Sequence, residues 1–540
     1  MYLFRLCMKN KNLAILLFGL FILGCSSTNL TSENFKKAEA NGQIVNEGYN
    51  RCLNFVNGWL EKADPVTGLI PENFKNSKGI DTWNAYNNAA DNYAFMVLTA
   101  YLLDEGLYNG RMLKMLNTEK RFTSRVRSLP DDYSFSKKNF VRDTIDMNWV
   151  IFGASEYCKD GLVPLAEYIG NSPWKDRMME MLDDLHSEFE VLKGVDKLGG
   201  YKAPDEEVNG EMLQTLSRIY WLTGDKKYLD WAIRIGDYYL LGERDLTQVD
   251  YLRMRDHGCE IISGLSELYV TLHFANPGKK ATYKESYYKL LNLILEKGRN
   301  EHGLFYNAFN PKEGTIADSG IADTWGYIYD AYYSVYLVDG YEPYLEAVKT
   351  TLSNLNGHYR NFPWEGKSHD GYADAIEGGI NLLNRISMPS LAEWIDSEIR
   401  VMFAMQQKNG LIGGWHGDGN FARTAIMYCL WKTQGAHCKP WRSDLKIGAT
   451  NEAGKLRLAI SAERDWNGKL KFDTERHKEN LHLPIDYPRI NQFPEWFTVS
   501  QDKEYSVNVN GKRTKASGSQ LISGIDLEVK SNHPLDIEIK

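Results

Sequence analysis

A short pattern in this chain recurs at widely separated positions. Gly68-Leu69-Ile70 precedes Asp81-Thr82-Trp83, and Gly303-Leu304-Phe305 precedes Asp323-Thr324-Trp325. A weaker copy starts at Gly410-Leu411-Ile412. In the first two copies, an Asp stands just before a predicted helix, where its carboxylate can accept hydrogen bonds from the free backbone N–H groups of the first helical turn. Self-similar units of this kind predict a chain built from repeated helical modules.

The spacing of apolar residues supports this prediction between residues 45 and 435. There, apolar residues recur at helical intervals in about seven pairs of stretches, joined by turns rich in Gly, Pro, Asn and Asp. A helix pair cannot bury its apolar face alone, so such pairs stack into a solenoid or a closed ring. We therefore predict a mainly α fold, an (α/α) toroid of six or seven helical hairpins, whose inner helices begin at one end of the ring.

The pattern changes after about residue 440. Residues 456–460, 469–472 and 505–509 alternate between apolar and polar side chains as strands do, and Asn508-Val509-Asn510-Gly511-Lys512 is typical of a hairpin turn. We predict a toroid catalytic domain over residues 45–438, followed by a small β-rich C-terminal domain over residues 439–540.

The N-terminus has the composition of an export signal. An apolar run over residues 13–23 follows two lysines and is too short for a permanent membrane helix. Gly24-Cys25 after this run resembles the bacterial lipoprotein motif, in which the Cys is lipidated and becomes the mature N-terminus. We predict a signal peptide over 1–24, lipidation of Cys25, a tether over 25–44 and an outer-membrane location. A signal peptide that is cleaved without lipidation is the alternative.

Composition and motif searches exclude several classes. The 63 Lys and Arg residues are outnumbered by 71 Asp and Glu residues, which disfavours nucleic acid as a partner. The chain has no phosphate-binding loop, no His-Glu-x-x-His zinc helix and no Gly-x-Ser-x-Gly elbow. No group of ligand-type residues has the spacing of a metal site, so neither a metal nor a cofactor is predicted. The five cysteines beyond Cys25 are expected to be buried thiols, with a Cys429–Cys438 bridge as the alternative.

Ionisable and aromatic residues gather in and near the loops that precede the predicted inner helices. In a toroid these loops meet at one mouth of the ring, where carboxylates can bind hydroxyls or move protons and aromatic faces can stack on sugar rings. Helix capping is the alternative for Asp81 and Asp323. The candidates for this mouth are Asp81, Trp83, Arg142, Asp143, Asp146, Glu206, Glu207, Asn209, Glu211, Arg253, Arg255, Asp256, His257, Glu260, Asp323, Trp325, Tyr329, His369, Asp370, Tyr372, Asp374, Glu377, Trp415, His416, Asp418 and Arg423.

The chain resembles the α/α-toroid carbohydrate-active lipoproteins that process uronic-acid glycans. The features that carry the resemblance are the export signal with its lipoprotein motif, the paired helices, the Gly-Leu-Ile-Pro type loops such as Gly68–Pro71, and the C-terminal β-domain. It is most similar to the oligosaccharide dehydratase of ulvan degradation, with the unsaturated glucuronyl hydrolases as the neighbouring family. The resemblance implies an enzyme that forms a 4,5-unsaturated uronic acid at the non-reducing end. Its partners would be an anionic oligosaccharide and, through the lipid, the membrane.

Such a dehydratase must neutralise the substrate carboxylate, remove the C5 proton and protonate the leaving C4 oxygen. An Arg suits the first task because its planar fork pairs both carboxylate oxygens. An imidazole suits the second because it titrates near neutral pH. We assign neutralisation to Arg255 and Arg423, the base to His257, the acid to Tyr329 or His416, and further substrate contacts to Trp83, Trp325, Trp415, Asp143 and Glu377.

Two alternatives stay open. A glycoside hydrolase would use Asp323 with Asp143 or Glu377 as its pair of carboxyl groups. A non-catalytic glycan-binding lipoprotein would need aromatic platforms but no converging ionisable groups.

Overall fold

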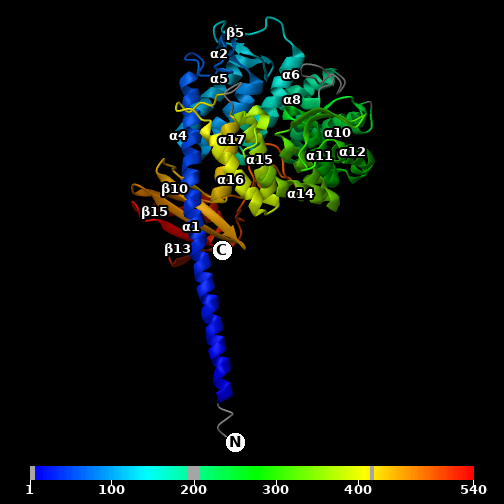
Figure 1. Cartoon of the computed structure of the whole chain (residues 1–540). Coiled ribbons are helices and arrows are strands. Elements are labelled where there is room, and N and C mark those ends of the chain that lie inside the picture. The colour runs from blue at the N-terminus through cyan, green and yellow to red at the C-terminus, as the bar shows by residue number, and fades with distance from the viewer. Residues whose placement is uncertain (1–6, 193–205, 243, 414–418) are drawn as a thin grey trace. The chain divides into compact units, whose positions relative to one another are not determined.

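The structure is a computed structural model that describes residues 7–192, 206–242, 244–413 and 419–540, with the backbone alone described for 7–31 and 189–192 (Figure 1). The chain forms two compact units. The larger unit comprises residues 48–431 and 474–496, and the smaller comprises residues 1–47, 432–473 and 497–540. The segment 474–496 therefore belongs to the helical unit, although it lies within the stretch predicted to be β-rich.

The larger unit is a ring of paired helices, which confirms the predicted fold class. Successive inner helices contact one another in chain order. Neighbouring inner helices approach closely where glycines face each other. Gly326 of α13 faces Gly378 of α15, and a Cβ added to Gly326 would lie 2.4 Å from the Cα of Gly378. The inner elements are η1 (Ala85–Tyr93) with α3 (Ala94–Leu103); α6 (Met147–Glu156), η3 (Tyr157–Leu162) and α7 (Val163–Ile169); α9 (Glu206–Thr223), α11 (Glu260–Ala275), α13 (Trp325–Asp339), α15 (His369–Arg385) and α17 (Asn420–Thr433).

The last inner helix returns to the first, so the ring closes. Thr424 of α17 donates to the carbonyl of Ala373 in α15 at 3.0 Å. On its other side, the guanidinium of Arg423 lies 5.9 Å from the ring centre of Phe95 in α3. Gly419, directly before α17, packs so tightly that a Cβ there would lie 1.9 Å from the carbonyl oxygen of Asp91.

The outer helices alternate with the inner ones along the chain. Helices α10, α12, α14 and α16 contact the inner helices α9, α11, α13 and α15 respectively. Residues 48–62 of α1 contact α17, since Cys52 lies against the carbonyl of Ala422. Over the described residues the ring thus has seven pairs, the larger of the two predicted numbers. The outer elements are α1 (Cys7–Lys62), α5 (Leu113–Thr123), α8 (Pro173–Leu192), α10 (Lys226–Leu240), α12 (Pro277–Lys297), α14 (Glu342–His358) and α16 (Pro389–Ala404).

The repeated Gly-Leu-apolar tripeptide is a structural repeat as well. Gly68, Gly303 and Gly410 all have positive φ, at 74°, 96° and 84°, a conformation that glycine adopts without strain. In each copy the glycine N–H closes a tight turn between an outer helix and the next inner element.

The Asp residues in the first two copies of the repeat, Asp81 and Asp323, do not cap helices in the predicted way. Asp81 accepts hydrogen bonds from Ser134 and Ser136 across a small sheet, and Asp323 accepts one from the N–H of Thr324. Side-chain caps are found at other inner helices: Asp146 is the N-cap of α6, and Ser368 is the N-cap of α15.

Short strands and helices connect the pairs of the larger unit. Its sheets pair β1 (Thr82–Trp83), β4 (Tyr133–Ser134) and β5 (Asn139–Phe140); β2 (Ser124–Val126) and β3 (Leu129–Pro130); and β6 (Leu252–Arg253), β7 (Tyr306–Asn310) and β8 (Thr315–Ile321). Its short helices are α2 (Ser77–Asp81), α4 (Glu105–Leu107), η2 (Tyr108–Met112), η5 (Leu246–Gln248), η6 (Asp256–Cys259), η7 (Trp364–Gly366) and α18 (Arg476–Glu479).

The smaller unit is β-rich, as the alternating stretches predict. A five-stranded antiparallel sheet has the order β10-β11-β16-β13-β14, and a three-stranded sheet has the order β15-β12-β9. Asn510 and Gly511 both have positive φ and join β13 to β14, as a tight hairpin turn requires. The elements are β9 (His437–Lys439), β10 (Leu445–Glu452), β11 (Lys455–Ala462), β12 (Trp466–Lys471), β13 (Glu504–Val509), β14 (Lys512–Ser517), α19 (Gly518–Ser523), β15 (Ile525–Val529) and β16 (Leu535–Ile539).

Residues 34–45, which fall largely in the predicted tether, are helical and packed within the smaller unit. Ala38 and Val45 are fully buried, and Asn41 donates to the carbonyl of Ala449 in β10 at 2.8 Å. The tether prediction therefore fails for this part, because the helix has an apolar face that the sheet covers. Among helices with described side chains, none combines the length and apolarity needed to cross a membrane. All five cysteines beyond Cys25 are buried thiols, so the alternative Cys429–Cys438 bridge is wrong.

The segment 474–496 lies across the axis of the helical ring. Arg489 pairs with Glu167 of α7 at 2.5 Å, and Asn381 of α15 donates to the carbonyl of Arg489 at 3.2 Å. Arg218 of α9 donates to the carbonyl of Ile490, and the N–H of Asn491 donates to Glu377 of α15 at 2.6 Å. Because these helices lie around the whole ring, the segment closes its bore.

Candidate active site

A cavity of about 460 Å³ opens among the starts of the inner helices, with Ile490 and Asn491 in its lining. The closing segment therefore forms its floor. Three lining residues, Asp256, Glu365 and Lys367, have positive φ, a strained conformation for non-glycine residues that clusters at functional sites.

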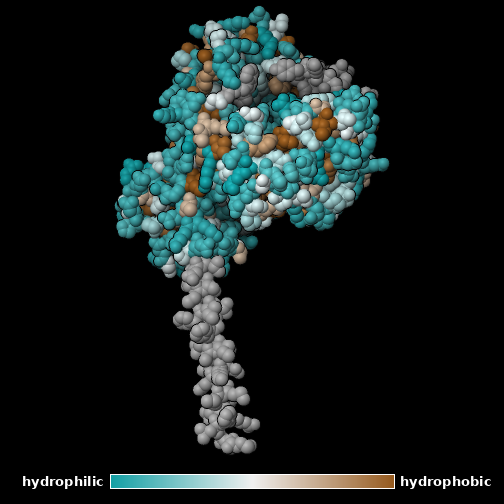
Figure 2. All heavy atoms as spheres, in the orientation of Figure 1, coloured by the Kyte–Doolittle hydropathy of each residue, from teal (hydrophilic) through white to brown (hydrophobic). Residues whose placement is uncertain are grey.

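The face shown in Figure 2 is mainly hydrophilic, with apolar residues scattered over its described part.

The cavity is strongly acidic. Among the described residues, the Lys and Arg side chains of its lining are Lys159, Lys367 and Arg423, and its histidines are His257 and His369. The carboxyl groups of its lining are those of Asp91, Glu156, Asp160, Asp256, Glu260, Glu365, Asp370 and Asp374.

Four of the residues that were assigned a catalytic or substrate-binding role from the sequence meet at this cavity. His257 and Arg423 line it. Glu377 is fully buried beside it and pairs with Arg423 at 2.7 Å. Asp323 is buried next to it, in the electrostatic field of the lining residues Asp374, Glu365 and Asp256.

Most of the other residues with an assigned role lie away from this cavity. The Tyr329 hydroxyl donates to the carbonyl of Gly303 at 2.6 Å, so Tyr329 is a core residue, and this position disagrees with its predicted acid role. Trp325 packs edge-to-face on Trp394, and Trp83 is buried in β1; neither lines the cavity. Asp143 is exposed in a loop, and Arg255 is outside the lining. Trp415 and His416 lie outside the described residues. The helical period explains the errors, since it identifies inner helices but not which side faces the bore.

Sequence analysis missed Glu156, Lys159 and Asp160, which line the cavity from the junction of α6 and η3. Their signal was present: three charged residues inside an otherwise apolar helical run must be paired or functional if that run is buried. η3 is a π-helix. This form is rare in proteins overall, and where it occurs it is often at a functional site.

Lys159 is neutralised by its neighbours. Its ammonium lies 2.7 Å from Asp160 and 2.6 Å from Glu260. Burial alone would raise the pKa of Asp160, but the Lys159 charge outweighs it and lowers that pKa to about 2. The pair therefore stays ionised at neutral pH.

Arg423 is neutralised in the same way. Its guanidinium lies 2.6 Å from Asp374 and 2.7 Å from Glu377. The Tyr327 hydroxyl lies 3.0 Å from Asp374 and 2.9 Å from Glu377, within hydrogen-bonding distance of both. Burial raises the pKa of Glu377 to about 7 although Arg423 opposes the shift. This cation is thus held by protein carboxylates, which disagrees with its predicted role as a free partner for a substrate carboxylate.

Asp323 has the properties of a carboxylic acid that keeps its proton. Burial, and then the charge of Asp374, raise its pKa to about 8. A carboxyl group that keeps its proton, beside a second carboxyl group that contacts the Arg423 guanidinium at 2.6 Å, is an arrangement that acid–base catalysis can use.

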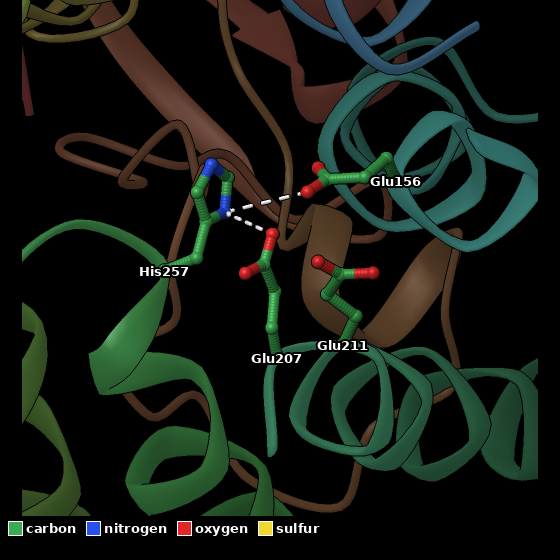
Figure 3. Close-up of side chains that lie close together, drawn as sticks. All are labelled: Glu156, Glu207, Glu211 and His257. Carbon is green, nitrogen blue, oxygen red and sulfur yellow. Dashed lines mark ion pairs between the residues drawn. The ribbon is translucent and has the colours of Figure 1, made fainter. Parts of the chain in front are cut away.

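A second group joins α6, α9 and η6 at the cavity (Figure 3). Nδ1 of His257 lies 3.4 Å from Glu156 and 3.8 Å from Glu207, and Glu211 completes the group. Burial alone would lower the pKa of His257, but the surrounding carboxylates, Glu207 first, raise it to about 10. A protonated imidazole cannot accept the C5 proton, so the predicted base role disagrees with this environment.

A smaller cavity of about 230 Å³ adjoins the first and shares His257 with it. Tyr251 lines it and is 56% exposed, which leaves an aromatic surface open to a ligand.

Comparison with known proteins assigns no family. No family model matches the chain, and no curated protein matches its sequence. Among solved structures it is similar to the GH76 α-1,6-mannanase from Salegentibacter sp. HEL1_6, with 13% identity, a TM-score of 0.41, and coverage of 58% of this chain and 96% of that one. A GH127 β-arabinofuranosidase has 12% identity, a TM-score of 0.38, and coverage of 94% and 78%. Cellobiose 2-epimerase from Bacillus thermoamylovorans B4167 has 13% identity, a TM-score of 0.38, and coverage of 51% and 86%. Likenesses this remote assign no activity.

Proposed function

We propose that the larger unit is a glycoside hydrolase for an uncharged glycan, with Asp323 as general acid and Asp374 as its carboxylate partner. The observation that carries this proposal is the different surroundings of the two carboxyl groups: Asp323 is buried with a pKa of about 8, while the Arg423 guanidinium contacts Asp374 at 2.6 Å. The neutral carboxyl protonates the leaving oxygen of the glycosidic bond. The ionised one activates a water molecule or attacks the anomeric carbon.

The charge of the cavity supports hydrolysis of a neutral sugar over elimination from a uronate. An anionic substrate would enter among eight lining carboxyl groups, and two of the three described lining Lys and Arg side chains are already paired at 2.6–2.7 Å. Bringing a further carboxylate into this field costs free energy unless a cation accompanies it. Hydroxyl groups meet no such cost, because carboxylates accept their hydrogen bonds.

Dehydration of a terminal uronate is the second candidate, and Lys367 is the observation that favours it. This exposed lysine lines the cavity, in a strained conformation with φ 71°. Unlike Lys159 and Arg423, it forms no ion pair with a carboxylate of the described residues, so its ammonium is the group that a substrate carboxylate would use.

One incubation series separates the candidates. The full chain is given neutral and uronate-terminated oligosaccharides, and products are read by mass spectrometry and a reducing-end assay. Hydrolysis adds one water and a new reducing end to neutral substrates. Dehydration removes one water from uronate substrates, raises ultraviolet absorbance and leaves chain length unchanged. Measurable affinity without turnover on either set would instead favour a glycan-binding protein.

Tyr251→Ala tests the smaller cavity as part of the binding site. We expect KM for an oligosaccharide to rise about fivefold with kcat nearly unchanged, because a stacked aromatic ring contributes about 1 kcal/mol. Tyr341→Ala is the matched control, since Tyr341 is also exposed but contacts Tyr288 and Tyr344 instead of either cavity. An unchanged KM for the Tyr251 variant would exclude this surface from substrate binding.

We also propose that Cys25 is lipidated and anchors the protein in the outer membrane, as the sequence motif suggests. Cys25→Ala is expected to abolish incorporation of a radiolabelled fatty acid and to release the protein from the membrane fraction. Cys7→Ala is the control, because Cys7 belongs to the predicted signal peptide and its loss should leave labelling unchanged. Labelling that survives in the Cys25 variant would refute the assignment.

A further inference from the structure

We propose that Glu156, Glu207, Glu211 and His257 form a binding site for a divalent transition-metal ion. One ligand atom from each residue lies within 4.8 Å of all the others. With metal–ligand bonds of about 2.0–2.1 Å, adjacent ligands of a tetrahedral ion lie about 3.3–3.4 Å apart, and opposed ligands of an octahedral ion lie about 4.0–4.2 Å apart. The observed separations, 3.4 Å from Nδ1 of His257 to Glu156 and 3.8 Å to Glu207, fall in this range.

Glu211 supplies an independent indication of a ligand. Its side chain is fully buried, and among the described residues no N–H or O–H donor reaches either of its carboxylate oxygens. Only a proton shared with the neighbouring carboxyl group of Glu156 could satisfy it from within the chain. Figure 3 shows this carboxylate pointing from α9 toward Glu156, into the space that the other side chains share. A buried carboxylate without a donor costs free energy, and a cation in that space would satisfy both oxygens at once.

The secondary structure holds the four groups in place. Glu207 and Glu211 are four residues apart in the first turns of α9 and so lie on one face of that helix. Glu156 ends α6 where the chain passes into the π-helix η3, and His257 lies in the 3₁₀ turn η6. Three rigid elements therefore fix three carboxylates and one imidazole around a common point, a site made on helices instead of mobile loops.

The ligand set indicates the class of ion. Ca²⁺ and Mg²⁺ take oxygen ligands and many of them, whereas an imidazole suits Zn²⁺, Mn²⁺ and related ions. Three carboxylates with one imidazole match the oxygen and nitrogen ligands of such an ion, without the thiolates of a structural zinc site. Because Glu156 and His257 also line the large cavity, an ion held here is accessible from it.

Metal titration of the untagged full chain tests the proposal without any assay of activity. After dialysis against EDTA, the protein is titrated with Zn²⁺ by calorimetry, with Mn²⁺ and Ca²⁺ in parallel, and bound metal is measured by mass spectrometry. We expect one equivalent of Zn²⁺, weaker Mn²⁺ and much weaker Ca²⁺, with a rise in Tm on Zn²⁺ addition. Co²⁺ in place of Zn²⁺ should give d–d absorbance bands that report nitrogen and oxygen ligands.

Two ligand variants and one control locate the ion. Glu211→Gln and His257→Gln should each weaken Zn²⁺ binding at least about a hundredfold, since even outer-shell changes cost about 10–100-fold. Glu206→Gln should bind as wild type does, because Glu206 lies in the same turn of α9 but pairs with Arg244 at 2.6 Å. Two ligand variants are used so that the test still stands if one of them fails to fold. Circular dichroism of the metal-free proteins checks that both variants are folded.

The outcomes divide cleanly. Stoichiometric binding that both ligand variants lose and the control keeps supports the site. Absence of one-equivalent binding would mean that protons alone hold the carboxyl groups together, and the proposal would be overturned. Binding that survives both substitutions would place the ion elsewhere and overturn it equally, and tighter Ca²⁺ than Zn²⁺ would refute the class of ion.

Discussion

Replacing Asp323 by asparagine is expected to lower kcat for an oligosaccharide about 10²–10⁴-fold, with substrate affinity and fold close to wild type. Asparagine keeps the shape of the side chain but has no proton to give to a leaving oxygen. A substrate with an acidic phenol as leaving group needs no protonation and should lose far less rate. Comparing the two substrates in steady-state kinetics therefore isolates the acid role.

Asp318→Asn is the matched control, because Asp318 is exposed on β8 and makes the same chemical change a few residues away. Its kinetics should match wild type. Equal rate losses for both kinds of substrate in the Asp323 variant would contradict the acid assignment and leave Asp323 a structural role.

The pH dependence provides a second reading of the same residue. With a pKa of about 8, Asp323 is protonated below that pH, so activity should fall as pH rises through about 8. A raised folded-state pKa also means that its contribution to stability is complete at low pH and is lost as pH rises to about 8. The Tm of Asp323→Asn relative to wild type should therefore increase from pH 5 to pH 9, and a constant difference in calorimetry would refute the raised pKa.

Arg489→Met is expected to give the largest loss of stability. Arg489 is almost fully buried and holds Glu167 at 2.5 Å, across the bore of the ring. Burial alone would raise the pKa of Glu167, but the Arg489 charge outweighs it and lowers that pKa. Removing the cation leaves a buried carboxylate unpaired, which costs about 3–5 kcal/mol in the free energy of unfolding. Chemical denaturation of the full chain measures this loss.

The double variant Glu167→Gln/Arg489→Met should recover much of that loss, because it removes both charges. Lys289→Met is the control for an exposed pair: Lys289 lies 3.1 Å from Asp245 with both side chains about half exposed, and the change should stay within about 0.5 kcal/mol. A loss for Arg489→Met as small as the control's would mean that the closing segment does not stabilise the ring.

Periodicity and repeats were sufficient to predict the fold class. The paired stretches became paired helices, the Gly-Leu-apolar tripeptides became equivalent turns, and the alternating stretches became β11, β12 and β13. These features depend on neighbouring residues, and local spacing specifies them. The segment 474–496 escaped prediction because its partners Glu167, Glu377 and Arg218 are far away in the chain.

The candidate site was predictable only in part. Arg423, Glu377, Asp323 and His257 do lie at one cavity, since all come from the starts of inner helices or the loops before them. Tyr329 and Trp325 come from the same kind of position and lie in the core instead. One residue further along a helix turns a side chain by about 100°, and only packing decides which side faces the bore.

The sequence by itself thus determined the order of helices and strands, the ring of repeated pairs and the acidic character of the chain. Each of these follows from composition and from residues that are close together along the chain. The protonation of Asp323, the pairing of Arg423 and the meeting of Glu156, Glu211 and His257 were decided by tertiary structure alone. The reason is physical: charge, burial and ligand geometry act over a few ångströms in space, and these residues are separated by tens to hundreds of positions along the chain.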